Sequence, residues 1–327
     1  KSNMKKINFE GKFVALKVHF GEYGNLAFIR PNYIKVVADY VKELGGIPFV
    51  TDASTLYSGR RSDAVSHINV AELNGFNSIT TGCPVIIADG LKGNDYKEIV
   101  VNLKHCSTVK IGTAFTEADI IISISHFKGH EQAGFGGTLK NIGMGCGSKL
   151  GKLEMHSGSK PVIDKEKCIA CGICVKNCNQ CAIYIEDKAV IDYNKCVGCG
   201  ECIVACPKKA ISQKEVNQSK MLNEKVAEYT YGVLKDKQHF HLNFIMDVSP
   251  NCDCFPASDL PIVPNIGITA SFDPVAIDMA SADLVNNAPI IKGSLLDEMH
   301  NEKEKDKFKC IHSNVDWKSG LDYAEEL

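Results

Sequence analysis

Short, continuous apolar runs alternate with helical patterns along the first half of the chain. The runs predict strands at 13–18, 47–50, 84–88 and 120–124, and the periodic stretches predict helices at 33–44 and 62–73. Pro31 before the first helix and Gly45 after it are typical of a helix start and end. Because the strands are apolar at every position, we expect both of their faces to be buried. That is the pattern of a mostly parallel α/β sheet covered by helices.

The same alternation resumes near residue 216. It predicts a helix at 221–234, strands at 240–246 and 266–270, and a further helix that ends near residue 285. Asp273 and Pro274 would start that last helix, as its N-cap and first helical residue.

Between these two stretches the chain repeats itself. The segment CIACGICVKNCNQCAI (168–183) aligns with CVGCGECIVACPKKAI (196–211) at an offset of 28 residues. A unit made of two similar halves brings its own ends together and can be inserted into another domain. We therefore predict one α/β host domain formed by 1–163 and 214–327, interrupted by a small α+β insert at 164–213.

Each half of the repeat contains Cys-x-x-Cys-x-x-Cys-x-x-x-Cys. In two-cluster proteins, three cysteines of one half hold a [4Fe–4S] cluster and the fourth ligand comes from the other half. We predict one cluster on Cys168, Cys171, Cys174 and Cys206, and a second on Cys196, Cys199, Cys202 and Cys178. The repeat resembles the bacterial-type two-cluster ferredoxins, except that Asn179 replaces the expected proline. Cys181 aligns with Lys209 and is predicted not to be a ligand; a reserve ligand is the alternative.

A structural zinc site is the main competing interpretation of these cysteines. Zinc sites use four ligands, usually in two separated Cys-x-x-Cys pairs, whereas this segment offers two interleaved quartets. A disulfide framework is disfavoured because the spacing is too tight for so many bridges.

Composition narrows the class of protein further. The 37 Lys and Arg residues nearly balance the 39 Asp and Glu residues, so no global field attracts nucleic acid or anionic lipid. No stretch approaches the roughly 18 apolar residues of a membrane span. Thiolate clusters suit a reducing compartment, so we expect a cytoplasmic protein.

Polar residues follow several predicted strands, at the edge where open α/β sheets bind ligands. They are His19, Asp52, Asp89, His126 and Asp247. Any one of them is explained by a strand ending at the surface, but the set predicts a polar crevice.

The segment 125–147 is the richest candidate for that crevice. His126, Lys128 and His130 are predicted to orient substrate, deliver protons or act as ligands. A glycine-rich turn at Gly134, Gly136 and Gly137 would let backbone approach a ligand, and Lys140 would add charge for an anion at the start of a helix over 138–144. Structural hydrogen bonding is the competing explanation for the histidines. The segment matches neither a dinucleotide fingerprint nor a phosphate-binding P-loop.

Cys252 and Cys254 lie in a polar loop between two prolines, where a buried structural role is unexpected. With Asp247, Asp253, His126 or His130 nearby, they would bind a further metal or act as a redox pair.

Four longer motifs extend beyond the cysteine repeat. They are KVHFGEYGN (17–25), TDASTLYSGRRS (51–62), SHFKGHEQAGFGGTLKNIGMGCG (125–147) and PNCDCFPASDLPIVPNIGITASFDPVAIDMASADLV (250–285). Together they resemble the domain-of-unknown-function 362 family of iron–sulfur proteins. The resemblance implies an α/β domain interrupted by a ferredoxin module and supplies no reaction. The family's opening is only approximated by INFEGK (7–12), so we expect its preceding strand to lie before Lys1.

Three functions remain open at this stage. The first is an oxidoreductase that moves single electrons between the clusters and a substrate or second cofactor, such as a flavin or metal, in the host domain. The second is an electron carrier whose host domain docks a redox partner protein. The third is a non-redox protein that binds a metal or an anion. An anionic small molecule is the expected ligand of the crevice, and a homo-oligomer is left open.

Overall fold

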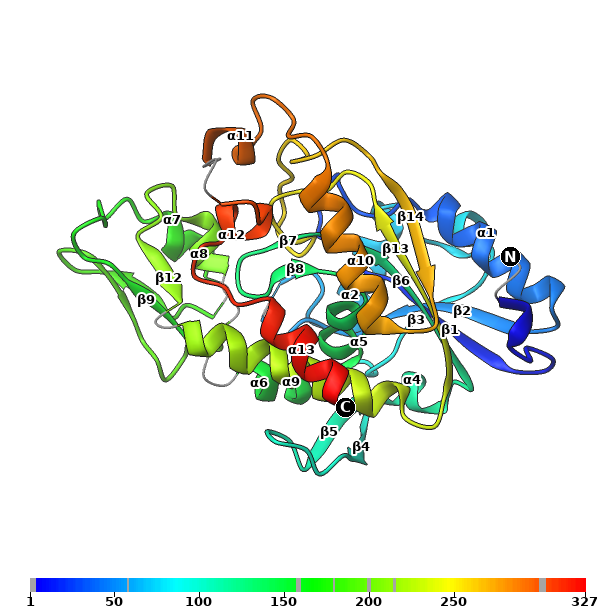
Figure 1. The fold of residues 1–327 in the computed structure, drawn as a ribbon. Coiled ribbons are helices and arrows are strands. Elements are labelled where there is room, and N and C mark those ends of the chain that lie inside the picture. The colour runs from blue at the N-terminus through cyan, green and yellow to red at the C-terminus, as the bar shows by residue number, and fades with distance from the viewer. Residues whose placement is uncertain are drawn as a thin grey trace.

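A computed structural model describes residues 4–57, 59–156, 160–178, 180–198, 201–213, 216–299 and 304–327. Within these residues the central sheet has six strands in the order β14–β13–β6–β1–β2–β3 (Figure 1). Their bounds are β1 (Phe13–Lys17), β2 (Ile47–Asp52), β3 (Val85–Ile87), β6 (Ile120–His126), β13 (Gln238–Ile245) and β14 (Gly267–Ser271). Each neighbouring pair is parallel except β13 with β14. The predicted mostly parallel sheet is confirmed, with one antiparallel edge strand.

The sheet joins chain segments from both sides of the cysteine repeat. β13 pairs with β6 over seven positions, from Gln238 opposite Ile120 to Phe244 opposite His126. Residues separated by more than a hundred positions therefore share one ladder, and their carboxyl ends open at the same edge.

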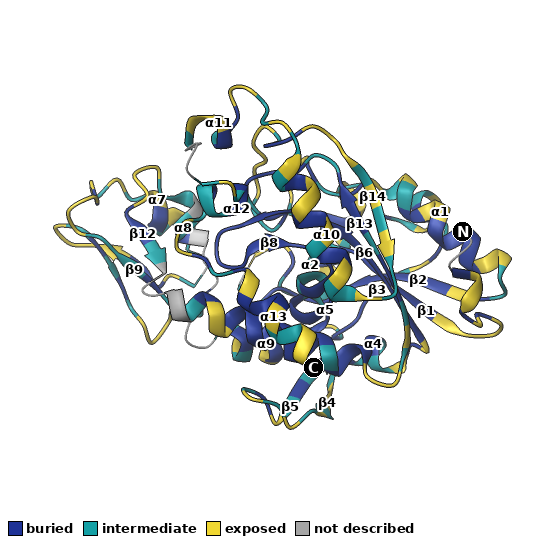
Figure 2. Ribbon diagram, viewed as in Figure 1, coloured by how far each residue is buried: buried dark blue, intermediate teal, exposed yellow. Residues whose placement is uncertain are grey.

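Helices cover both faces of the sheet because successive strand residues point to opposite sides. Val14 and Leu16 pack with α1 (Pro31–Glu43) on one face. Ala15 and Ile121 pack with α5 (Thr138–Cys146) and α9 (Val216–Leu234) on the other. Figure 2 shows the central strands as buried and the outer loops as exposed. Because helices bury both faces of the sheet, the central strands contain continuous apolar runs.

Helices α2 and α10 also follow the sequence expectations. α2 (Ala64–Leu73) begins after Asp63, whose side chain accepts from the Ser66 N–H. α10 (Pro274–Asn287) begins after Asp273, whose side chain accepts from the N–H groups of Val275 and Ala276. The remaining elements of the host are η1 (Met4–Lys6), α3 (Ser78–Thr81), β4 (Tyr96–Val100), β5 (Thr108–Gly112), α4 (Thr113–Glu117), β7 (Lys128–His130), β8 (Gly134–Gly136), α6 (Lys149–His156), α11 (Leu295–Met299), α12 (Lys307–Ile311) and α13 (Lys318–Glu326).

The cysteine repeat lies at one end of the molecule, beside the central sheet and its helices (Figure 1). Its elements are β9 (Pro161–Ile163), α7 (Ile173–Lys176), β10 (Ile183–Ile185), β11 (Ala189–Ile191), α8 (Glu201–Ala205) and β12 (Ile211–Gln213). β9 pairs antiparallel with β12, and β10 with β11. Since β9 precedes residue 164, the closing strand pair begins three residues before the predicted boundary. We call residues 161–213 the cysteine unit.

Among the described residues, no helix combines the length and apolar character needed to cross a bilayer.

Candidate functional site

A polar cavity of about 100 Å³ lies where the parallel strands end. Lys17 is the last residue of β1, Asp52 is the last of β2, and both side chains line the cavity. α5, α6 and the loop after β13 supply most of the opposite wall, through Lys140, His156 and Cys252. The predicted crevice at the carboxyl ends of the strands is therefore present. We call it the strand-end pocket.

Cations outnumber anions around the strand-end pocket. Lys17 pairs with Asp52 at 2.9 Å, and both side chains are almost fully buried. Lys152 donates to the Gly147 carbonyl, and burial lowers the pKa of its amine to about 8 although Asp89 and Asp52 oppose that shift. Lys140 makes no side-chain hydrogen bond or salt bridge among the described residues, and its charge faces the pocket beside Cys252 and His156.

Two further cations of the pocket are already paired. Arg61 donates from Nε to Glu22 at 2.9 Å, and Lys128 lies 3.2 Å from a carboxylate oxygen of Asp253. Lys128 therefore lines the pocket as predicted, but the carboxylate of Asp253 partly neutralises its charge.

Asp253 anchors the loop that carries the two cysteines. Its buried carboxylate accepts from His126 Nδ1 at 2.8 Å, while His126 Nε2 donates to the Met246 carbonyl at 2.8 Å. Burial would raise the pKa of Asp253, but the charges of His126 and Lys128 hold it well below its usual range. His126 does not line the pocket. Both of its ring nitrogens are engaged within the protein, by Asp253 and by the Met246 carbonyl, which favours a positioning role over the predicted catalytic one.

Cys252 and Cys254 flank this anchor and both face the strand-end pocket. A turn closed by Phe255 N–H to the Cys252 carbonyl at 3.0 Å brings them together. The two sulfurs and a ring nitrogen of His130 all lie within 4.8 Å of one another. The hydrogen bond from Cys254 is the main cause that lowers the pKa of Cys252, and the same bond raises the pKa of Cys254. Of the two sulfurs, Cys252 is therefore the one whose surroundings favour the thiolate.

His130 is oriented as a hydrogen-bond donor to this pair. Its Nδ1 accepts from the backbone N–H groups of Gln132 and Ala133, each at 3.1 Å. A neutral imidazole with an accepting Nδ1 carries its hydrogen on Nε2. That hydrogen stabilises the Cys252 thiolate. A metal-binding histidine shows the opposite arrangement, with the non-ligating nitrogen donating, so the geometry disfavours a metal on His130.

The start of α5 is not the anion site that the glycine-rich segment predicted. The carboxylate of Asp278 already accepts from the N–H groups of Thr138 and Leu139, at 2.7 and 2.9 Å. A Cβ on Gly137 would lie 2.3 Å from that carboxylate, which explains the glycine. Burial raises the pKa of Asp278 to about 6. The helix N-terminus is thus satisfied from within the protein.

Other predicted residues divide between the pocket and its surroundings. Gly136 lines the pocket, as does Gly137. Gly134 packs against Trp317 instead. Asp247 does not line the pocket and is partly exposed, with its carboxylate 3.9 Å from Arg30.

Two small cavities lie among the described residues of the cysteine unit, and each is bordered by cysteines from both halves of the repeat. The first is bordered by Cys168, Cys171, Cys174 and Cys206. The second is bordered by Cys178, Cys196 and Cys202, and the predicted fourth ligand, Cys199, lies outside the described residues together with Asn179. Cys181 is exposed and borders neither cavity. The fold therefore groups the described cysteines in the interleaved pairing expected from their spacing.

The backbone of the cysteine unit follows the same 28-residue repeat. Ala170 and Gly198 both have positive φ, at 55° and 78°, as do Cys181 and Lys209, each at 49°. Ala182 N–H points to Cys178 Sγ and Ala210 N–H points to Cys206 Sγ, both at 3.3 Å. Backbone donors aimed at sulfur are among the features that tune iron–sulfur clusters. The seven described cysteines of the two predicted ligand sets, with these backbone donors, are compatible with the predicted clusters.

The cysteine unit touches the rim of the strand-end pocket. The Gly198 carbonyl accepts from Gln132 Nε2 at 2.9 Å, and the Gly198 backbone also hydrogen bonds to His156. His156 lines the pocket, and Gln132 lies two residues after His130. The loop between Cys196 and Cys199 is therefore joined directly to the pocket wall.

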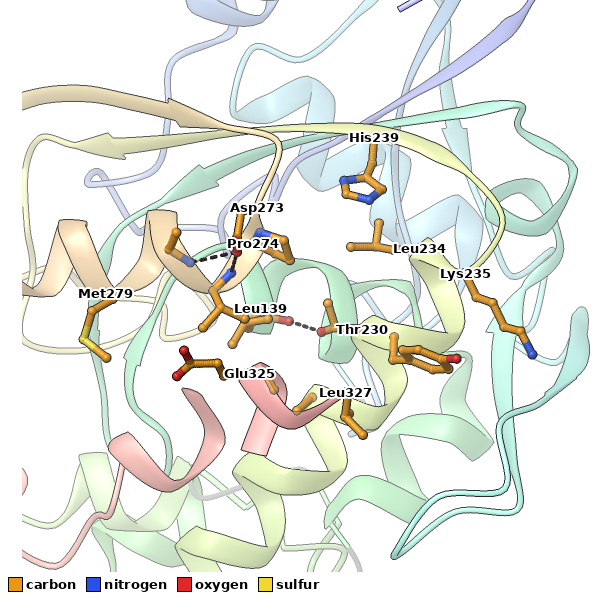
Figure 3. A pocket seen from close by; sticks show the side chains of 15 residues that line it. Leu139, Thr230, Leu234, Lys235, His239, Asp273, Pro274, Met279, Glu325 and Leu327 are labelled. Atoms are coloured by element: carbon orange, nitrogen blue, oxygen red, sulfur yellow. Dashed lines mark hydrogen bonds between the residues drawn. The ribbon is translucent and has the colours of Figure 1, made fainter. Parts of the chain in front are cut away.

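A larger cavity, of about 520 Å³, lies between α9, α10 and α13 (Figure 3). Its lining is mostly apolar, and two of its polar residues are engaged locally. Asp273 caps α10, and Thr230 donates to the Leu139 carbonyl at 2.9 Å. Because it lacks convergent polar groups, we place the functional site in the smaller, charged pocket.

Several pocket residues were missed from the sequence. A lysine inside an apolar strand was a usable signal for Lys17, because a buried lysine needs a partner. The other missed residues are Arg61, Lys152 and His156. Their sequence neighbours are largely polar or glycine, so nothing in the sequence indicates that they are buried.

Comparison with known proteins finds similarity to a curated relative and to several solved structures. A thylakoid-associated protein from Synechocystis sp. is 27% identical over 123 residues, which cover 38% of this chain and 34% of that protein. The lactate racemase apoprotein from Thermoanaerobacterium thermosaccharolyticum is 15% identical with a TM-score of 0.36, covering 73% of this chain and 44% of that chain. A protein from Thermotoga maritima is 12% identical with a TM-score of 0.44, and the match covers 88% of this chain and 57% of that chain.

These likenesses are too low to carry an argument about activity, and the match to the curated relative spans about a third of its length. The family assignment is stronger because it covers most of the chain, including every pocket residue named above. Residues 14–283 match the family described as "Domain of unknown function (DUF362)", and the chain belongs to that family.

Proposed function

We propose that this protein is an iron–sulfur oxidoreductase that moves single electrons between two [4Fe–4S] clusters in the cysteine unit and a small anionic substrate in the strand-end pocket. The observation that carries the proposal is the contact at Gly198. This residue lies in the loop of the predicted second cluster, and its backbone hydrogen bonds to Gln132 and to the pocket residue His156. A redox centre there would have a short path to the pocket.

The cysteine cavities support the clusters as the redox groups. Two bound clusters would supply one-electron transfer, with potentials set by their surroundings. The chain's part is to present the sulfurs and to aim the N–H groups of Ala182 and Ala210 at two of them.

The charge of the strand-end pocket supports an anionic substrate. Lys140 makes no side-chain hydrogen bond or salt bridge among the described residues, and Lys128 and Lys152 lie on the same lining. A cavity of about 100 Å³ is well below the roughly 300–1,000 Å³ of pockets for drug-sized ligands. Its size favours a small acid over a flavin.

An electron carrier that only docks a partner is the second candidate. A docking surface recognises its partner through exposed groups. The charged groups of this pocket are buried inside the host, and the side chains of the Lys17–Asp52 pair are only 1% and 4% exposed. The buried site therefore favours an enzyme over a carrier.

The first test is the metal content of protein purified without oxygen. Two cubane clusters require about eight iron and eight sulfide per chain. Stoichiometric zinc, or iron near four after full reconstitution, would contradict the proposal.

The second test asks whether the pocket and the clusters communicate. Sulfate should perturb the electron paramagnetic resonance signal of the reduced protein, and Lys140→Met should abolish the perturbation. Lys92→Met, which changes an exposed lysine outside the pocket, is the matched control. An unperturbed signal in all three proteins would favour the carrier.

A further inference from the structure

The strand-end pocket contains a thiol pair that electron transfer through the cysteine unit does not use. Cys252 is 2% exposed and Cys254 is partly exposed, and both line the pocket. Their loop is held from behind by Asp253, which is bound to His126 and Lys128. A buried network of Asp253, His126 and Lys128 thus fixes the loop in which the two sulfurs lie close together.

The surroundings of the pair distinguish its two sulfurs. Cys252 accepts hydrogen bonds from Cys254 and from His130 and lies in the field of Lys140 and Lys128, all of which favour its thiolate. The hydrogen bond with Cys252 and burial raise the pKa of Cys254, and the nearby carboxylate of Glu131 adds to that shift. Cys252 is therefore the nucleophile and Cys254 the resolving thiol.

We propose that Cys252 and Cys254 form a redox-active thiol pair that exchanges with a small anionic disulfide bound in the strand-end pocket. Lys140 would hold the acidic group of the substrate beside the thiolate. This activity is separate from the proposed electron transfer and does not require that the cysteine unit holds clusters.

The exchange balances in two steps. Cys252 Sγ attacks one sulfur of the substrate, so a mixed disulfide forms, the substrate S–S bond breaks, and the first half leaves as a thiolate. Cys254 Sγ then attacks Cys252 Sγ, which releases the second half as a thiolate. The proton of Cys254 passes to a leaving thiolate. The substrate gains two electrons, and the pair becomes an internal disulfide.

The test uses the full chain, purified without oxygen and treated with dithiodiglycolate, the disulfide of two mercaptoacetates. Peptide mapping should find an internal Cys252–Cys254 disulfide in the wild type. Cys254→Ser should instead trap one mercaptoacetate on Cys252, because the resolving thiol is gone. Cys252→Ser should leave Cys254 unmodified. Cys310→Ser, outside the pocket, should behave as the wild type.

Charge selectivity gives a second readout. The wild type should react at least about tenfold faster with dithiodiglycolate than with neutral 2-hydroxyethyl disulfide, and Lys140→Met should remove that preference. Equal rates in the wild type would overturn the anionic substrate class.

Two results would overturn the thiol pair itself. One is the absence of both the internal disulfide and the trapped adduct in folded protein. The other is a stoichiometric metal that is lost in Cys252→Ser and Cys254→Ser while the iron of the cysteine unit is retained. Neither result affects the iron and sulfide counts that test the proposed function, so the two proposals fail separately.

Discussion

Cysteines occur in two very different settings in this molecule. In the cysteine unit the sulfurs are arranged by a repeated backbone, and main-chain N–H groups of Ala182 and Ala210 point at them. In the strand-end pocket Cys252 is surrounded by side chains of other elements, including His130 and Lys140. Local backbone geometry suits the first set to a compact inorganic group. Tertiary charges suit the second to chemistry on sulfur itself.

The two regions also differ in how they are stabilised. The cysteine unit has a small core of its own, built from Ile183, Ile191 and Ile211 together with several cysteines. The pocket is stabilised by buried ion pairs such as Lys17–Asp52 and Lys128–Asp253. Buried pairs are sensitive to the loss of either partner, because the other is left charged and unpaired. Substitutions in the two regions should therefore have different signatures.

The largest expected effect is on the cysteine unit. Cys178→Ser should remove one predicted cluster, so that iron falls from about eight to about four per chain. Cys181→Ser, three residues away and exposed, is the matched control and should leave the iron unchanged. Iron analysis and absorption spectra of both variants measure the effect. Equal loss in the two would make Cys181 a ligand.

Asp253→Asn tests the buried network of the pocket. Removing one partner should destabilise the fold by about 3–5 kcal/mol, because His126 and Lys128 lose their counter-charge. Asp259→Asn changes an exposed carboxylate in the same loop and should stay within about 0.5 kcal/mol. Urea unfolding of both variants gives the comparison. Similar midpoints would mean that the network contributes little stability.

Deletion of the cysteine unit tests how far the two regions are independent. Replacing residues 161–213 by a short Gly-Ser linker should leave a folded host, because β6 and β13 pair without it. We expect a loss of about 1–3 kcal/mol, since the buried Gln132 amide loses the Gly198 carbonyl. Circular dichroism during thermal unfolding would show it. A shortened chain without a cooperative transition would make the unit integral to the core.

The smallest expected effect is the pH dependence of anion binding. Burial lowers the pKa of Lys152 to about 8, so its amine is charged below that pH and neutral above it. The pocket then loses one positive charge, and sulfate should bind about tenfold more weakly at pH 9 than at pH 7, or 1.4 kcal/mol. Calorimetric titration at both values measures the change. Lys152→Met should abolish the pH dependence, and its persistence would assign it to another group.

Much of the fold could be predicted because its signals are local. Continuous apolar runs marked the parallel strands, and Asp273 with Pro274 marked the start of α10. The antiparallel direction of β14 was not predicted, since apolar pattern alone does not set strand direction. The short strand β9 was also not predicted, because it is recognisable only through its pairing with β12.

The candidate site was less predictable, because its properties depend on contacts between distant segments. The glycine-rich turn before α5 suggested an external anion, but Asp278, about 140 residues away in the chain, occupies that position. His126 was expected in the pocket, but it lies outside the lining and donates a hydrogen bond to the Asp253 carboxylate. Asp247 follows its strand as expected, yet pairs with Arg30 outside the pocket.

The sequence by itself determined the α/β class, the 28-residue repeat and the expected interleaved grouping of its cysteines, because each is expressed in local patterns of apolar residues or in residue spacing. Only the tertiary structure decided which charges meet. The pairing of Lys17 with Asp52, the donor orientation of His130 and the contact of Gly198 with Gln132 all join residues whose distance in space is unrelated to their local pattern. Ionisation and hydrogen bonding depend on that distance and on burial, so the chemistry of the strand-end pocket emerges only once the sheet has brought its strand ends together.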